Sequence, residues 1–174
     1  MGADLPRDPE KQWWVAETLS WRDEYPFESQ FLEADGYRYH FLDEGEGDPV
    51  LMVHGNPTWS FYWRHLVLAL RPRQRAIAVD HLGCGLSDKP ADYPYRLEDH
   101  VANLVGLIKQ LDLDNITMVV HDWGGPIGLS VALQLRGRIR RLVILNTGAF
   151  PPLRSPCEFV VAGSPCWEIS WYDD

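Results

Sequence analysis

The stretch that decides the fold is NITMVVHDWGGPIG, residues 115–128. Its first six residues are mostly apolar and β-branched, which is typical of a strand buried on both faces of a sheet. Two glycines come shortly after Asp122 and open a segment that has the composition of a helix. The pattern therefore predicts a buried strand, a sharp turn at Asp122 and a helix packed close behind the turn.

Similar apolar runs recur along the chain and alternate with helical patterns. We expect buried strands at 49–53, 75–80, 115–120 and 141–145, and helices at 61–70, 97–111 and 124–135. This alternation is typical of parallel βαβ units. Two shorter runs, 29–34 and 37–43, flank Asp35-Gly36, a dipeptide that favours a tight hairpin. The predicted fold class is α/β, a mostly parallel sheet with an N-terminal antiparallel hairpin and helices on both faces.

The length of the chain, 174 residues, suits one domain. Residues 1–28 are rich in charge, Trp and Pro, and we expect an irregular N-terminal segment there. Residues 29–152 carry the regular patterns and form the expected core domain. Residues 153–174 have no clear period and several turn residues, so they are expected to form a tail of uncertain structure.

Composition narrows the possible partners and the location. The formal net charge of −9 argues against nucleic acid and anionic membrane surfaces as partners. No apolar run is long enough to span a bilayer and the N-terminus is polar, so we expect a cytoplasmic protein without a signal peptide. Three cysteines, Cys84, Cys157 and Cys166, fit a reducing compartment and suggest neither a disulfide framework nor a zinc site.

Three loops follow predicted strands and contain glycines where the backbone must turn tightly. They are HGNPTW (54–59), HLGCGLSD (81–88) and HDWGG (121–125). Functional groups of open α/β sheets gather at the carboxyl ends of the strands, so these loops are expected to meet at one edge. The glycine loops lack phosphate-binding patterns, and no organic cofactor or metal is expected.

The third loop places an acid where many hydrolases of this topology carry a serine. The pattern of a strand, a sharp turn and a Gly-opened helix is that of a nucleophile elbow, but Asp122 stands at the elbow and Val120 replaces the usual preceding glycine. A carboxylate there can attack an sp³ carbon and form an ester intermediate. The N-terminus of the following helix would stabilise it as an anion.

The motifs HGNPTWSFYWR (54–64), DHLGCGLSDKP (80–90) and HDWGGPIG (121–128) resemble those of haloalkane dehalogenases, which are α/β-hydrolases. The resemblance implies that Asp122 displaces halide, giving alcohol through an alkyl-enzyme ester. It also implies that the indole of Trp123 and the side-chain amide of Asn56 bind the halide, while the backbone N–H groups of the same two residues form an oxyanion hole. His54, Gly55, His121 and Gly124 are expected to position the loops.

Two sister groups share the aspartate elbow. The β-lactone decarboxylases of bacterial olefin synthesis share the Asn–Trp pair as well, and the sequence does not separate their substrates from halogenated ones. Epoxide hydrolases share HDWGG but usually carry an aromatic residue where Asn56 stands. A small apolar halogenated or lactone substrate is expected in either of the first two cases.

The histidine that activates water in these families should follow the elbow, yet none of the six histidines lies after Asp122. The strand at 141–145 also ends in Leu145-Asn146-Thr147, without a carboxylate. We therefore expect a truncated chain with only the N-terminal portion of the fold and no cap domain, either inactive, limited to a single turnover or acting as a non-catalytic fragment. The apolar strand 141–145 would then be an exposed sheet edge open to self-association.

Overall fold

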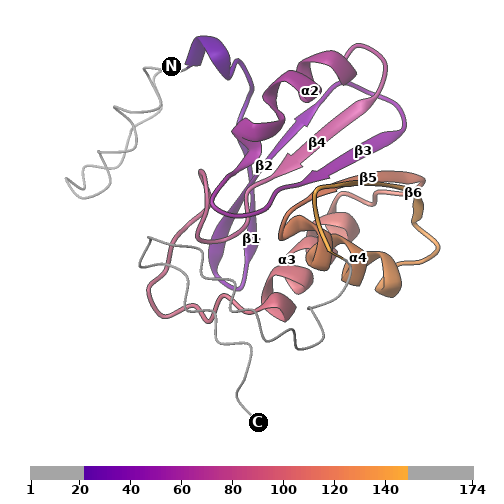
Figure 1. The fold of residues 1–174 in the computed structure, drawn as a ribbon. Helices are drawn as coiled ribbons and strands as arrows, with labels where there is room; N and C mark the ends of the chain where they lie inside the picture. The colour runs from indigo at the N-terminus through magenta and orange to yellow at the C-terminus, as the bar shows by residue number, and fades with distance from the viewer. Residues whose placement is uncertain (1–21, 149–174) are drawn as a thin grey trace.

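The computed structural model describes residues 22–148, and the expected tail at 153–174 lies outside them, as do residues 1–21 of the N-terminal segment. The described part is built on one sheet of six strands in the order β1-β2-β4-β3-β5-β6 (Figure 1). The strands are β1 (Gln30–Ala34), β2 (Tyr37–Glu44), β3 (Pro49–Val53), β4 (Arg75–Val79), β5 (Ile116–His121) and β6 (Ile139–Leu145). The predicted α/β architecture is confirmed, with small shifts at the strand ends.

The antiparallel hairpin forms at the predicted dipeptide. Ala34 pairs with Tyr37 across a two-residue turn in which Asp35 and Gly36 both have positive φ, 51° and 81°. Positive φ at both central residues matches the right-handed twist of the strands, and Asp and Gly tolerate it well. The second strand of the hairpin, β2, then pairs antiparallel with β4, while the pairs β4–β3, β3–β5 and β5–β6 are parallel.

Strand β3 lies at the centre of the parallel part, and all five of its residues are buried. Because side chains alternate along a strand, Leu51 and Val53 join one hydrophobic cluster and Val50 and Met52 join the other. A run with no polar position is what a strand covered on both faces requires. This explains why its observed bounds equal the predicted ones.

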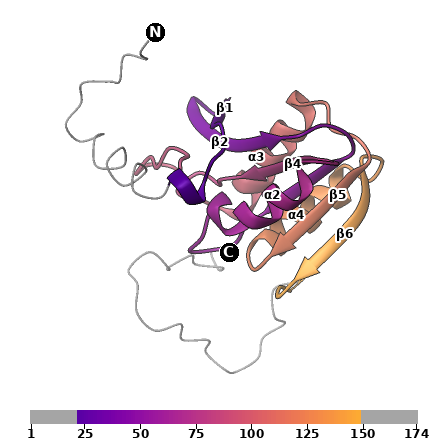
Figure 2. The same cartoon turned by 90° about the horizontal axis from the view of Figure 1, so that it is seen from above.

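Helices cover both faces of the sheet, as predicted (Figure 2). The short 3-10 helix η3 (Ser60–Trp63) and α2 (Arg64–Leu70) pack on the face of Val50 and Met52 through Trp63 and Val67. Helices α3 (Leu97–Gln110) and α4 (Gly124–Gln134) pack on the opposite face, and both contribute to the larger cluster. Each fully buried aliphatic side chain in these clusters stabilises the fold by about 2 kcal/mol.

The predicted helix at 61–70 differs from the observed one at its start, since its first turn is the 3-10 helix η3. Trp59 precedes that turn and offers no side-chain hydrogen bond to cap it. The backbone N–H of Ser60 instead donates to the buried carboxylate of Asp80, 2.6 Å away. A tertiary contact therefore replaces the local cap that the first turn lacks.

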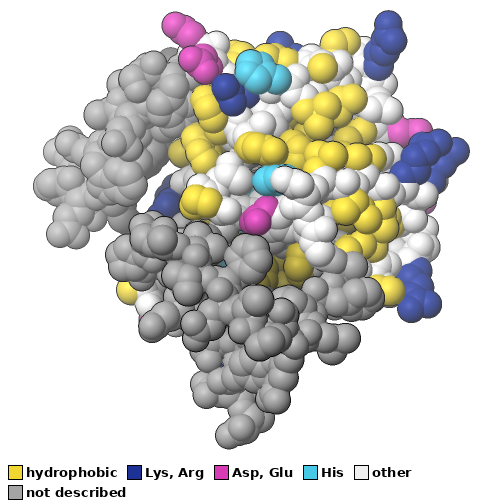
Figure 3. Space-filling view, viewed as in Figure 1, with side chains coloured by type: hydrophobic (Ala, Val, Ile, Leu, Met, Phe, Trp, Pro, Cys, Tyr) yellow, Lys and Arg dark blue, Asp and Glu magenta, His cyan; other side chains and the backbone are white. Residues whose placement is uncertain are grey.

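Strand β6 forms the edge of the described sheet. Its residues Leu142, Val143, Ile144 and Leu145 are 40–54% exposed, and they alternate between the two faces. Hydrophobic side chains also gather on the side of the molecule where β5 and β6 lie (Figure 3). Within residues 22–148, no helix is long and apolar enough to cross a membrane.

Candidate active site

Asp122 stands at the sharp turn between β5 and α4, as the sequence predicts. Its φ of 51° is in the left-handed region, which few residues other than glycine, asparagine and aspartate adopt. The N–H of Gly125 donates to the carbonyl oxygen of Asp122 at 2.9 Å and closes the turn. The side chain is half-buried at the carboxyl edge of the sheet.

Glycines make room for this turn on two sides. A side chain on Gly55 would overlap the Asp122 carboxylate, since its Cβ would lie 2.7 Å from Cγ of Asp122. A side chain on Gly124 would overlap the end of β3, with its Cβ 2.8 Å from the carbonyl oxygen of His54. Both values are shorter than any ordinary van der Waals contact. The two loops therefore approach each other closely only because these positions lack a Cβ.

Asn56 lies against the carboxylate. Its backbone N–H donates to Oδ1 of Asp122 at 2.9 Å. Its side-chain oxygen Oδ1 accepts a hydrogen bond from the Cys84 thiol, with 3.5 Å between sulfur and oxygen. Trp123 follows Asp122 directly and stands at the N-cap position of α4, half-buried. The structure thus brings Asp122, Asn56 and Trp123 to one edge of the sheet.

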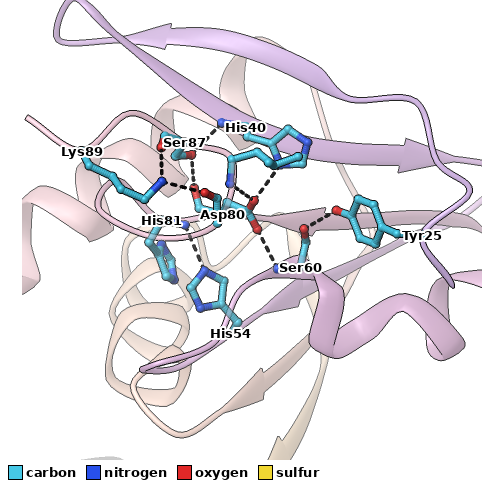
Figure 4. Close-up of polar contacts among 10 residues, drawn as sticks. Tyr25, His40, His54, Ser60, Asp80, His81, Ser87 and Lys89 are labelled. Carbon is cyan, nitrogen blue, oxygen red and sulfur yellow. Dashed lines mark hydrogen bonds and ion pairs between the residues drawn. The ribbon is translucent and has the colours of Figure 1, made fainter. Parts of the chain in front are cut away.

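His54 joins two of the three loops from a fully buried position (Figure 4). Its Nε2 accepts a hydrogen bond from the backbone N–H of His81 at 3.0 Å. Its Nδ1 must then carry the proton, which it donates to the carbonyl oxygen of Gly55 at 2.6 Å. Burial lowers the pKa of His54, so the imidazole is neutral at pH 7, as this pair of hydrogen bonds requires.

His121 occupies the last position of β5, and its ring contacts residues of η3. Its ring stacks on the ring of Tyr62, with 4.8 Å between centroids and 18° between planes. Its neighbour Asp122 is held from a third side by Thr147, whose hydroxyl donates to the Asp122 carbonyl oxygen. Thr147 lies shortly after the end of β6 at Leu145, so three strand ends converge on the elbow.

A buried acid ties the neighbouring loops together (Figure 4). Asp80 is fully buried, and its carboxylate accepts hydrogen bonds from the N–H groups of Ser60 at 2.6 Å and Leu86 at 2.8 Å. Nδ1 of His40 lies 2.9 Å from Oδ2 of the same carboxylate. Burial alone would raise the pKa of Asp80, but the contact with His40 and the N–H of Leu86 hold it below its ordinary value. The acid is therefore ionised at neutral pH.

Sequence patterns did not single out Asp80, Cys84 or Thr147 as parts of the site. Asp80 directly follows the apolar strand RAIAV and precedes the glycine loop, a place where an acid is usually solvated. Its only sequence signal is that position, directly after a buried strand. Within residues 22–148, no group of three or more His, Cys, Asp or Glu side chains is arranged to hold a metal ion.

Comparisons with known proteins identify the family. Residues 48–167 match the sequence family described as alpha/beta hydrolase fold. The chain is 54% identical over 128 residues to a cis-3-alkyl-4-alkyloxetan-2-one decarboxylase of Shewanella oneidensis, a match covering 72% of this chain and 40% of that protein. It is 42% identical over 127 residues to haloalkane dehalogenase 2 of Mycobacterium tuberculosis, covering 73% of this chain and 44% of that protein.

The crystal structure of the haloalkane dehalogenase DatA from Agrobacterium tumefaciens C58 is similar to this fold. The TM-score is 0.66 at 35% identity, and the match covers 69% of this chain and 41% of that one. The chain thus spans less than half the length of each of these three proteins. The expected resemblance to dehalogenases and to β-lactone decarboxylases is confirmed, because an oxetan-2-one is a β-lactone. On the family match over residues 48–167, the chain belongs to the alpha/beta hydrolase fold family.

Proposed function

We propose that this chain supplies the nucleophile and the leaving-group site of an aspartate-based hydrolase that acts on a small apolar substrate. The observation that carries the proposal is the hydrogen bond of 2.9 Å from the Asn56 N–H to Oδ1 of Asp122. That bond holds Oδ1 of the carboxylate against a backbone N–H donor. The other oxygen, Oδ2, would attack the substrate carbon. The attacking oxygen is held by a backbone turn, so little reorganisation precedes reaction.

With a haloalkane, the first step is a displacement at carbon. Oδ2 forms a bond to the carbon that bears the halogen, the carbon–halogen bond breaks, and the halide leaves with the electron pair. Oδ1 then becomes the carbonyl oxygen of the ester, already bound to the N–H of Asn56. If an external base took a proton from water, attack of that water on the ester would place negative charge on Oδ1, where the backbone N–H groups of Asn56 and Trp123 would act as the oxyanion hole. Collapse of this intermediate would release the alcohol and restore the Asp122 carboxylate.

The departing halide needs donors of its own. We assign this role to the indole N–H of Trp123 and to the side-chain amide of Asn56. The indole nitrogen only donates hydrogen bonds, so it cannot present an acceptor to the halide. Both residues flank Asp122, one in sequence and one through the backbone hydrogen bond. His54, Gly55, His121 and Gly124 are proposed to position the loops. The contacts of His54 with Gly55 and His81 support this for His54, and the absence of a Cβ supports it for the glycines.

A β-lactone is the second candidate substrate, favoured by the 54% identity to the Shewanella oneidensis decarboxylase. Oδ2 would attack C4, the sp³ ring carbon bonded to the ring oxygen, and the bond between C4 and the ring oxygen would break to give a free carboxylate. Loss of CO₂ then sends an electron pair into the new double bond and expels Asp122 as a free carboxylate. This route regenerates Asp122 without water, whereas dehalogenation requires hydrolysis of the ester.

The test uses the 174-residue chain with 1-bromobutane and, separately, with a cis-3,4-dialkyl-β-lactone. Intact mass and peptide mapping follow an alkyl adduct on Asp122, and free bromide, CO₂ and alkene are measured in parallel. A mapped adduct with one bromide released per chain supports a nucleophile that completes only the first step. Continuous release of CO₂ and alkene supports the lactone candidate, and continuous bromide release supports a complete dehalogenase.

Asp122→Asn is the matched control, because the amide has the shape of the carboxylate but is a far weaker nucleophile. Asn also tolerates the positive φ at this position. The variant should form no adduct and release no product. If wild-type protein neither forms an Asp122 adduct nor releases product from either substrate, the chain is a non-catalytic fragment and the proposal is wrong.

We also propose that the chain self-associates through β6. Both faces of this edge strand expose apolar side chains, and a parallel edge strand of this kind is normally covered. Pairing of two copies along β6 would satisfy the backbone groups that face away from β5, which no other strand of the described sheet pairs with, and would remove apolar surface from water.

A further inference from the structure

The loop after β4, residues 80–88, holds the loop after β3, residues 54–60, at three points. Asp80 accepts a hydrogen bond from the N–H of Ser60, and the N–H of His81 donates to the ring of His54. These two contacts fix the ends of the β3 loop. The third contact is different, because it reaches the side chain of Asn56: the Cys84 thiol lies 3.5 Å from Oδ1 of that amide.

The position of the Cys84 thiol is set by its backbone. The N–H of Cys84 donates to the carbonyl oxygen of His81 at 2.9 Å, and its own carbonyl oxygen accepts from the N–H of Ser87 at 3.2 Å. The glycines on either side, Gly83 and Gly85, have φ of 89° and 50°. A side chain at Gly85 would overlap the carboxylate of Asp80, so the tight path of the loop depends on this glycine.

The direction of the hydrogen bond follows from two facts: the partner atom on Asn56 is Oδ1, which only accepts, and the thiol keeps its proton. Burial, reinforced by the negative charge of Asp80, raises the pKa of Cys84 to about 11. At neutral pH the sulfur therefore keeps its proton and donates it to the carbonyl-type oxygen of the Asn56 amide. The Nδ2 group, on the other arm of the amide, is then directed away from Cys84.

We infer that Cys84 is a positioning residue that fixes the orientation of the Asn56 side-chain amide, so that Nδ2 rather than Oδ1 serves the leaving group. The inference rests on the proposed function for the role of Asn56 in binding the leaving group. The orientation of the Asn56 amide does not depend on that function. Without the thiol, the amide can rotate by half a turn and place a partially negative oxygen where an anion must form. Such an arrangement would repel the leaving group instead of stabilising it.

The first test compares Cys84→Ala with Cys84→Ser, using the rate of Asp122 adduct formation from 1-bromobutane and 1-chlorobutane. Loss of the hydrogen bond in Cys84→Ala should slow the bromide reaction about fivefold. It should slow the chloride reaction more, because chloride is the poorer leaving group and depends more on its donors. Cys84→Ser keeps an O–H donor and should retain the wild-type ratio of the two rates. Equal slowing of both reactions in Cys84→Ala would indicate a merely structural role and overturn the inference.

A double-mutant cycle tests whether Cys84 affects the reaction through Asn56 or by another route. If Cys84 acts through Asn56, adding Cys84→Ala to Asn56→Ala should slow the reaction no further. If the two substitutions multiply their effects, Cys84 acts elsewhere and the inference is wrong. Peptide mapping assigns each adduct, so alkylation of the thiol in the wild-type chain is not counted.

The last test does not depend on any reaction. It can therefore decide the orientation of the Asn56 amide even if no Asp122 adduct forms. Absence of the adduct by itself counts only against the proposed function. The side-chain NH₂ signals of Asn56 are identified in a ¹⁵N spectrum by their loss in Asn56→Asp. They should shift or broaden in Cys84→Ala and remain close to their wild-type positions in Cys84→Ser. Unchanged signals in Cys84→Ala would overturn the inference.

Discussion

Gly55 and Asp122 pack so closely that no side chain fits between them. A Cβ on Gly55 would lie 2.7 Å from Cγ of Asp122 and would overlap its Oδ1. The β3 loop can therefore bring the N–H of Asn56 to within 2.9 Å of the carboxylate only because residue 55 is glycine. The relationship links a backbone requirement in one loop to the placement of the nucleophile in another.

Gly55→Ala should destabilise the chain and displace Asp122. Neither the elbow backbone nor β3 can move away easily, so overpacking should lower the free energy of unfolding by about 2 kcal/mol. Adduct formation at Asp122 should be lost in the fraction that remains folded. Urea unfolding and intact mass measure the two effects. The matched control is Gly106→Ala on the exposed face of α3, where an added Cβ meets nothing within 4 Å.

Gly106→Ala should keep or raise the free energy of unfolding, by up to about 1 kcal/mol, because alanine favours the helix. It should leave adduct formation unchanged. If Gly55→Ala behaves like Gly106→Ala in both measurements, the close packing described for Gly55 is not a constraint on the site.

Asp80→Asn should be strongly destabilising although it preserves shape. The carboxylate receives N–H groups on both oxygens, from Ser60 on Oδ1 and from Leu86 on Oδ2. An amide has one oxygen, so its NH₂ group would face one of these donors and leave a buried N–H unpaired. We expect the free energy of unfolding to fall by about 3 kcal/mol, measured by urea unfolding.

Asp112→Asn is the control for that change. The Asp112 side chain is 87% exposed beside Arg138, and Asn tolerates its φ of 46°. The free energy of unfolding should change by less than about 0.5 kcal/mol. Comparable effects of the two substitutions would contradict the role given to the buried carboxylate of Asp80.

The fold and the elbow could be predicted from sequence because their signals are local. PVLMV is apolar at every position, so its bounds and its central place follow from composition alone. The meeting of Asn56 and Asp122 follows from a general rule, since parallel strands bring their carboxyl ends to one edge. The Asp35-Gly36 turn is equally local.

The supporting contacts could not be predicted, because their partners lie far apart in sequence. Asp80 is buried only because His40 from β2 and the N–H of Ser60 meet its carboxylate. The contact between Cys84 and Asn56 likewise depends on the relative position of the loops after β3 and β4. No sequence pattern within either loop specifies that position. Such contacts become visible only when the tertiary arrangement is known.

Acidification should weaken the fold through its buried imidazoles. Burial lowers the pKa of His54, of His81 and, to about 4, of His100. An unfolded chain protonates these groups near pH 6.5, while the folded chain resists until lower pH. The unfolded state then binds more protons, so the free energy of unfolding falls as pH drops below about 6.5.

Urea unfolding between pH 7.5 and 5 checks this trend. The slope of the free energy of unfolding against pH should correspond to between about one and three protons per chain. His100→Gln should reduce this slope by about one proton. The low pKa of Asp80 adds stability that is lost only at lower pH, below its unfolded value near 4, so it does not contribute in this window. A free energy of unfolding that stays constant from pH 7.5 to 5 would contradict the prediction.

Ile144→Lys should reduce self-association through β6. Ile144 is 54% exposed on the edge strand, and a lysine there would add charge to the surface that is proposed to pair. Sedimentation velocity over a concentration series should show wild-type protein forming dimers or larger species and Ile144→Lys remaining monomeric. Leu133→Lys, which changes a 63% exposed residue of α4, should associate like wild type. If wild-type protein is monomeric throughout, or if both variants dissociate equally, the edge of β6 is not the interface.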